Sequence, residues 1–165
     1  MRKAALLPAA ILALAFTPGH AMEGMARYEV RVDGLSCPFC VRGLEKKLQA
    51  LAGASHVQVD LETGRARLES RAPLLPEALD KAVRDAGFSP RAIHLTIQGI
   101  LQISGDHWSL LIGEGRTLPL LGGRQFGRLQ TLLEAGKRAV VLSGEASRVA
   151  GHWQLSVEEA GEARP

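Results

Sequence analysis

The chain of 165 residues is poor in several residue types that mark well-known classes of protein. It has two cysteines, too few for a disulfide scaffold, a four-cysteine zinc site or a four-cysteine iron–sulfur cluster. Aromatic residues make up 4%, the formal charge is only +3, and no run of Lys or Arg is present, so nucleic-acid binding is not expected. Hydrophobic residues make up 46%, which excludes a disordered chain, and the length suits one large domain or two small ones.

The first 21 residues have the three-part pattern of a secretory signal peptide. Arg2 and Lys3 form a positive start, an apolar run covers residues 4–16, and small residues lead up to Ala21. The run is too short for a permanent transmembrane helix. We therefore predict cleavage after Ala21, with Ala26 as a second candidate and an uncleaved anchor as the alternative. The mature protein is then expected in a bacterial periplasm.

Residues 27–98 are predicted to form one small domain. Strands are expected where apolar and polar residues alternate, over residues 28–33, 57–61, 66–68 and 93–97. Helices are expected where the apolar spacing becomes three and four, from Pro38 to Leu51 and from Pro76 to Ala86. The order β-α-β-β-α-β is that of a ferredoxin-like domain, with two helices on one face of an antiparallel sheet.

Residues 99–160 are predicted to form an OB-like β-barrel of unknown role, which makes the fold class α+β. Five short strands between glycine-bearing turns are expected over residues 100–103, 108–112, 117–121, 138–142 and 153–157. One helix, over residues 124–135, falls between the third and fourth of these strands, as in an OB-type barrel. An SH3-like barrel is the alternative, and residues 158–165 are expected to be a frayed tail.

Two His-Trp pairs, His107-Trp108 and His152-Trp153, open two of the strands of this second domain. Two histidines at one barrel rim would be able to hold a second metal ion. A Trp that enters a core just after a turn is the more common situation, and we favour that structural interpretation.

Both cysteines, Cys37 and Cys40, lie at the junction between the first strand and the first helix. Cys37 is expected on the loop and Cys40 in the first helical turn, so that both sulfur atoms can point to one spot. Ser36 is expected to cap this helix, and Pro38 is tolerated in its first turn. The positive end of the helix lowers the thiol pKa, which favours the thiolate that binds metal.

Two thiolates with no third donor nearby suit a soft ion that accepts two ligands in a near-linear arrangement. Cu(I) and Hg(II) meet that description, whereas Zn(II) requires four ligands. We therefore predict one Cu(I) or Hg(II) ion per chain, with Cys37 and Cys40 as the metal ligands. An exposed site with two ligands also leaves room for a partner's thiolate to enter and take the ion.

The residues around the cysteines also resemble a known family. The run GLSCPFC at residues 34–40 resembles the G-M-x-C-x-x-C signature of the heavy-metal-associated domain family, and DAGF at residues 85–88 resembles its second signature. The family contains copper chaperones, metal-binding modules of copper-transporting ATPases and a periplasmic carrier of mercuric ions. The resemblance implies that Phe88 shields the metal site. Leu35 stands where the family usually has Met, a buried anchor of the loop.

A redox function is the competing hypothesis, because Cys-Pro-aromatic-Cys is also the form of glutaredoxin-like and thioredoxin-like active sites. In that case Cys37 is the nucleophile and Cys40 the resolving thiol of a periplasmic thiol–disulfide oxidoreductase. Those folds need further βα crossovers and a cis-proline that faces the pair. The element order here has a hairpin instead, so we favour metal binding, and a purely structural disulfide is the third possibility.

The sequence therefore predicts an exported carrier of soft metal ions that is not an enzyme. Cys37 and Cys40 capture the ion, while Ser36, Pro38 and Phe39 shape the loop. Release is expected by ligand exchange with a metal-transporting membrane protein or another metal-binding protein. The carrier is expected to be a monomer that contacts membrane partners only transiently and binds no nucleic acid.

Overall fold

The computed structural model describes residues 26–163. The predicted signal peptide, residues 1–21, lies outside the described residues, so export stays a prediction. None of the described helices is long and apolar enough to cross a membrane.

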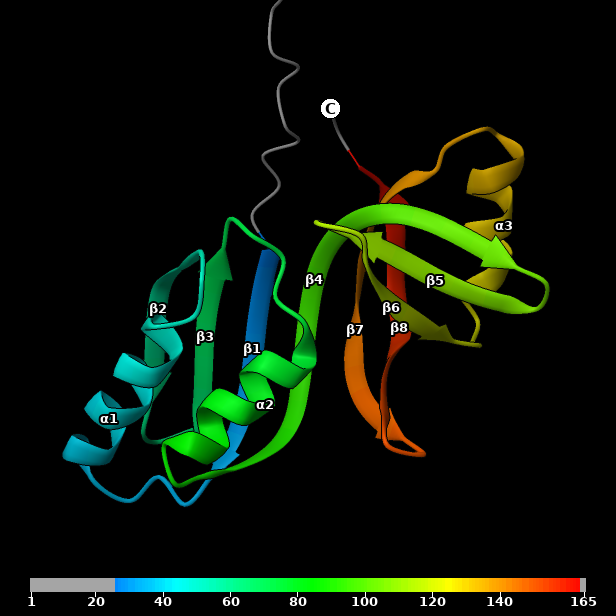
Figure 1. Ribbon diagram of the computed structural model, residues 1–165. Coiled ribbons are helices and arrows are strands. Elements are labelled where there is room, and N and C mark those ends of the chain that lie inside the picture. Colours follow the sequence, from blue (N-terminus) through cyan, green and yellow to red (C-terminus); the bar gives the residue numbers. More distant parts are fainter. Residues whose placement is uncertain (1–25, 164–165) are drawn as a thin grey trace, which may run out of the picture.

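The first six elements confirm the order predicted for the ferredoxin-like domain. They are β1 (Ala26–Asp33), α1 (Pro38–Gln49), β2 (Ala54–Asp60), β3 (Arg65–Ser70), α2 (Pro76–Asp85) and β4 (Ser89–Ser104). The strands pair antiparallel in the order β2-β3-β1-β4, and both helices cover one face of this sheet (Figure 1). The strands form because alternate side chains, such as Tyr28 and Val30, enter the core, where they meet Leu44 of α1 and Leu79 of α2.

The remaining elements form a closed β-barrel. They are β5 (His107–Ile112), β6 (Arg116–Leu121), α3 (Phe126–Glu134), β7 (Ala139–Val149) and β8 (His152–Glu162). Neighbouring strands run in the order β4-β5-β6-β8-β7, and β7 pairs again with β4, which closes the barrel. The contact between β6 and β8 is parallel. The α+β class and the barrel region are thus confirmed, while the description of the barrel as OB-like stays a prediction.

Strand β4 belongs to both regions. Its residues 89–96 pair with β1, residues 93–100 pair with β7 on the other side, and residues 100–104 pair with β5. The boundary expected between Gln98 and Gly99 therefore falls inside a continuous strand of 16 residues. A side chain at position 99 would put its Cβ 2.6 Å from the carbonyl oxygen of Leu111, so glycine is required where the strand enters the barrel.

The expected frayed tail at residues 158–165 is wrong for the part that the structure describes. Strand β8 continues to Glu162, which pairs with Val140 of β7. Ala160 and Ala163 are buried, and Lys137 forms an ion pair with Glu162. Small side chains that alternate with glutamates gave too weak an apolar signal for a strand, and the partner strand supplies the missing stabilisation.

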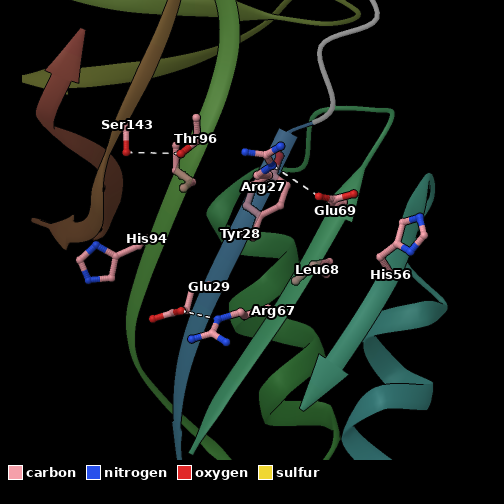
Figure 2. A pocket seen from close by; sticks show the side chains of 11 residues that line it. Arg27, Tyr28, Glu29, His56, Arg67, Leu68, Glu69, His94, Thr96 and Ser143 are labelled. Carbon is pink, nitrogen blue, oxygen red and sulfur yellow. Dashed lines mark hydrogen bonds and ion pairs between the residues drawn. The ribbon is translucent and has the colours of Figure 1, made fainter. Parts of the chain in front are cut away.

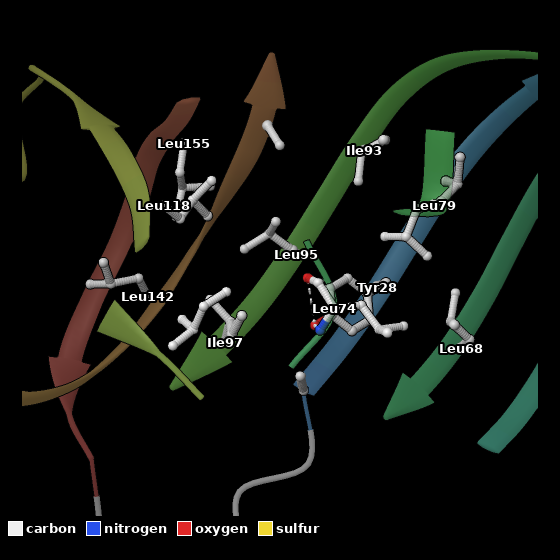
Figure 3. Packing of buried hydrophobic residues seen from close by; sticks show 14 of the residues in the cluster. Tyr28, Leu68, Leu74, Leu79, Ile93, Leu95, Ile97, Leu118, Leu142 and Leu155 are labelled. Atoms are coloured by element: carbon white, nitrogen blue, oxygen red, sulfur yellow. Dashed lines mark hydrogen bonds between the residues drawn. The ribbon is translucent and has the colours of Figure 1, made fainter. Parts of the chain in front are cut away.

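The buried residues form one cluster that runs through both regions (Figure 3). Ile93, Leu95 and Ile97 of β4 lie between α2 and the barrel, where Leu118 and Leu155 are buried. Outside the sheet, the side chain of Arg116 in β6 donates a hydrogen bond to the carbonyl oxygen of Pro73, at 2.9 Å, and so ties the barrel to the loop before α2. The two regions are therefore joined by a strand, a shared core and a loop contact.

Candidate metal site at the start of α1

A tight turn carries the chain from β1 to α1. Gly34 has a φ of +94°, which favours glycine, and it directly follows the last residue of β1. Leu35 is half-buried and packs against the core, as expected for the residue that replaces the family's methionine. Asp33 of β1 and Arg91 of the neighbouring strand β4 form an ion pair next to this turn. The loop that bears the cysteines is thus anchored at its first residues.

Cys37 itself is the N-cap of α1. Its backbone is extended, with φ −150° and ψ 153°, and its Sγ accepts a hydrogen bond from the backbone N–H of Cys40 at 3.2 Å. Its carbonyl oxygen accepts the N–H of Val41 at 3.3 Å. The expectation that Ser36 caps the helix is therefore wrong: Pro38 is the first helical residue, so the cap falls on Cys37.

The sulfur atoms of Cys37 and Cys40 meet, as the helix-start geometry predicts. They are joined as a disulfide, their Cα atoms are 5.2 Å apart, and both residues are half-buried. No group of three or more His, Cys, Asp or Glu side chains comes together as metal ligands in residues 26–163. Once reduced, the site therefore offers two converging thiolates without further protein donors nearby.

The electrostatic surroundings favour thiolates. The first turn of α1 contains no acidic residue, and its free N–H groups place partial positive charge at the cysteines. Glu45, the acidic residue of α1, is half-buried, and its carboxylate accepts a hydrogen bond from the backbone N–H of Val59 at 3.2 Å. The start of the helix therefore stabilises negative charge on sulfur, and the single carboxylate of α1 is engaged with β2 instead of the cysteines.

Two aromatic residues of the site lie in opposite environments. Phe88 is half-buried against the core, and its ring would lie 3.6 Å from a Cβ built on Gly34, beside the turn that leads to the cysteines. Phe39, between the cysteines, is 84% exposed. The position of Phe88 agrees with a shielding residue, whereas Phe39 projects outward.

The two His-Trp pairs fit the structural interpretation. Trp108 is half-buried, and its ring meets that of Phe126 edge-on, at 5.0 Å between centroids. The guanidinium of Arg148 lies 5.4 Å from the centre of the Trp153 ring. Both tryptophans thus have packing partners inside the barrel region.

A shallow depression of about 300 Å³ lies on the sheet face away from the helices (Figure 2). Glu29 accepts from Arg67 at 2.7 Å and lies 3.1 Å from Arg65, and these arginines hold the pKa of the Glu29 carboxyl below its usual range. Arg27 lies 3.4 Å from Glu69. Both carboxylates that border the depression are thus paired with arginines. It lies along the middle of the strands, apart from the cysteines.

Two histidines, His56 and His94, border this depression and are exposed. His94 lies 3.6 Å from Glu145. The sequence pattern did not reveal that neighbour, because the pairing of β4 with β7 was not predicted.

Comparison with known proteins assigns the chain to a family. Residues 29–89 match the model of the heavy-metal-associated domain. The COP-associated protein of Helicobacter felis is 36% identical over 62 residues, which cover 38% of this chain and 94% of that relative. The chain belongs to the heavy-metal-associated domain family, and copper- and heavy-metal-binding, chaperone-like domains are its relatives.

Two further relatives are much longer than the region that they share with this chain. The copper chaperone CopZ of Archaeoglobus fulgidus is 33% identical over 78 residues, which cover 47% of this chain but 37% of that protein. Copper-transporting ATPase 2 of Rattus norvegicus is 34% identical over 53 residues, covering 32% of this chain and 4% of the ATPase. Among solved structures, oxidized MerP from Ralstonia metallidurans is 28% identical with a TM-score of 0.38, covering 41% of this chain and 96% of MerP.

Proposed function

We propose that this protein is an exported carrier of Cu(I) that holds one ion between the thiolates of Cys37 and Cys40. The observation that carries the proposal is the convergence of both sulfur atoms at the start of α1, where the Cα atoms are 5.2 Å apart. Two thiolates in near-linear coordination are a common arrangement for a soft monovalent ion.

Copper is favoured over mercury by the relatives. The proteins named above include a copper chaperone and a copper-transporting ATPase, and the matched region contains the cysteine pair. Hg(II) accepts the same two sulfur ligands and stays the second candidate. A direct competition between the two ions at this site is therefore part of the test.

Ion transfer is proposed to proceed by ligand exchange. The site exposes one side to solvent, so a thiolate of a metal-transporting protein can add to the ion and form a three-coordinate intermediate. One cysteine of the carrier then dissociates, and the second partner thiolate replaces the other. No electrons are exchanged in these steps, and the carrier is not a catalyst of a covalent reaction.

The proposed export sets a condition on the cysteines. In an oxidising compartment the pair closes as the disulfide that the structure contains. Two electrons and two protons from a thiol reductant must open this bond before an ion binds. Binding then releases the thiol protons that remain, so retention of the ion weakens as the pH falls.

The barrel is proposed to be of the OB type. If β4 to β8 are counted as its five strands, the first pairs with the second and the fourth, the third and fifth run parallel, and α3 lies between the third and fourth. This order supports the proposal.

The decisive experiment is a titration of the reduced mature protein with Cu(I) against a chromogenic chelator. One tightly held ion per chain is expected, and Cys37→Ser and Cys40→Ser are each expected to lose it. Ser36→Ala is the matched control, because Ser36 is an exposed neighbour that does not cap the helix. Weak retention of Cu(I) together with rapid reduction of insulin would contradict the carrier and favour the oxidoreductase.

A further inference from the structure

Phe39 is the most exposed of the large apolar side chains described. It is 84% exposed, against 45% for Ile103, 43% for Val149 and 37% for Ile100. Its position between the two ligand cysteines, in the first turn of α1, leaves the ring in water unless another molecule covers it. The packing of this chain does not explain an aromatic residue here.

Phe39 begins a stripe along the solvent side of α1. Arg42, Gly43 and Lys46 follow at spacings of three and four, so they lie on the same face as the ring, and all of them are exposed. A Cβ built on Gly43 would have no atom within 4 Å, so the helix backbone is bare next to the ring. The stripe therefore combines one projecting apolar ring with an uncovered stretch of helix backbone and two basic side chains.

The charge of this stripe is positive and uncompensated. Neither Arg42 nor Lys46 forms an ion pair with any described residue. Glu45 is turned to β2, where the backbone N–H of Val59 donates to it. A partner protein that covers the stripe would thus bind more tightly if it had an apolar recess for the ring, with acidic side chains around that recess.

We propose that this stripe is the docking surface for the protein that exchanges the metal ion, with Phe39 as its anchor. The inference rests on the proposed function and adds the partner's chemistry: an apolar recess with an acidic rim beside the partner's own thiols. Any partner thiolate that reaches the ion between Cys37 and Cys40 brings its surface over Phe39. Aromatic anchors that fill a recess commonly carry much of the binding free energy.

A membrane surface is the other environment that takes an exposed aromatic ring with basic neighbours. Stable membrane binding needs a broad apolar face or a lipid anchor, and here a single ring stands among charged residues. The stripe fits a protein partner better, and lipid binding becomes one outcome of the test.

The first test compares reduced, Cu(I)-loaded Phe39→Ala with Ile103→Ala, which truncates an exposed apolar side chain of β4 beyond the metal domain. The acceptors are a chromogenic Cu(I) chelator and a purified, acidic Cys-x-x-Cys domain of a copper-transporting ATPase. Phe39→Ala is expected to slow transfer to the protein about 10- to 100-fold at subsaturating acceptor, as loss of one buried aromatic predicts. Transfer to the chelator reports on the metal site itself, so the readout is the ratio of the two transfer rates. Phe39→Ala is expected to lower this ratio, and Ile103→Ala is expected to leave it as in wild type.

The second test reverses the charge of the stripe. The double variant Arg42→Glu/Lys46→Glu is expected to slow transfer to the same acceptor several-fold at low salt, and the difference is expected to shrink at high salt. Arg138→Glu, a reversal at an exposed barrel residue, is the matched control.

Equal effects of Phe39→Ala on chelator and protein acceptor would overturn the inference, because the ring would then act on the metal site itself. Unchanged transfer to the protein would overturn it as well, as would Phe39-dependent sedimentation with phosphatidylserine vesicles. In all three cases wild-type protein still binds Cu(I), so the proposed function survives. Failure of the reduced wild type to retain Cu(I) would instead overturn the proposed function, and the docking surface with it.

Discussion

The hydroxyl group of Tyr28 is hydrogen-bonded to both backbone groups of Leu74. It accepts from the N–H of Leu74 at 2.7 Å and donates to its carbonyl oxygen at 3.2 Å, with both residues buried. The pair joins β1 to the loop before α2, the same loop that Arg116 of the barrel contacts through Pro73. The only tyrosine of the chain therefore holds together the end of the sheet opposite the cysteines.

Replacement of Tyr28 with Phe is expected to lower the free energy of unfolding by about 1–3 kcal/mol, because it leaves a buried N–H and C=O without a partner. Urea denaturation measures this change. Thr131→Ala removes an exposed hydrogen bond to the carbonyl of Gly127 and is expected to change stability by less than about 0.5 kcal/mol. Similar effects of both substitutions would contradict the structural role of Tyr28. Cu(I) affinity is expected to be the same in both variants.

Alkaline pH is expected to destabilise the protein through the same tyrosine. Burial raises the pKa of Tyr28 to about 12, whereas the pKa of a tyrosine in an unfolded chain is about 10. The folded state holds the proton more tightly, so its contribution is complete below pH ~10 and is lost as the pH rises from ~10 to ~12, by roughly 2–3 kcal/mol. Phenolate absorbance reports Tyr28 alone. Ionisation near pH ~10 in the folded protein, or the same pH dependence in Tyr28→Phe, would contradict the prediction.

Gly144 is expected to be intolerant of any side chain. A Cβ at this position would overlap the carbonyl oxygen of Ser156, where the register of β7 and β8 shifts by a bulge. Gly144→Ala is therefore expected to cost about 1–3 kcal/mol or more of stability. Gly161→Ala in the same strand pair meets no atom within 4 Å and is expected to be neutral or slightly stabilising. Thermal melts of the two variants provide the comparison, and equal melting temperatures would contradict the packing of this bulge.

Unfolding of the whole chain is expected to be a single cooperative transition. Strand β4 contributes to both the metal-binding sheet and the barrel, and the core is continuous across it. Calorimetry of the reduced, metal-free protein measures the number of transitions. Two well-separated transitions would show instead that the predicted regions 27–98 and 99–160 are independent domains.

Local signals in the sequence were sufficient for the metal-binding half. The alternation around Tyr28 and Val30, the helical spacing of Leu44 and Leu48, and the glycines at the turns predicted the observed order of elements. These signals suffice because each element buries one face, and the spacing of apolar residues follows the period of the backbone. The convergence of Cys37 and Cys40 followed from the same helix start.

The capping residue and the end of the barrel were not predictable in that way. Ser36 and Cys37 are both possible N-caps of a helix that begins at Pro38. Which of them caps the helix depends on the path of the backbone in the turn after Gly34. The second half of β8 contains Glu158 and Glu159 next to small residues, a pattern that has no strong strand signal by itself. Pairing with β7 decides its conformation.

The sequence by itself determined the two thiols three residues apart and the helix that begins between them, because these depend on neighbours along the chain. The exposure of the Phe39 ring was found only in the structure. Only the tertiary structure decided that β4 runs on through Gly99 and that β7 covers its free edge. That edge pairing joins residues between 39 and 53 positions apart, and hydrogen bonds between distant strands leave no periodic trace in either segment.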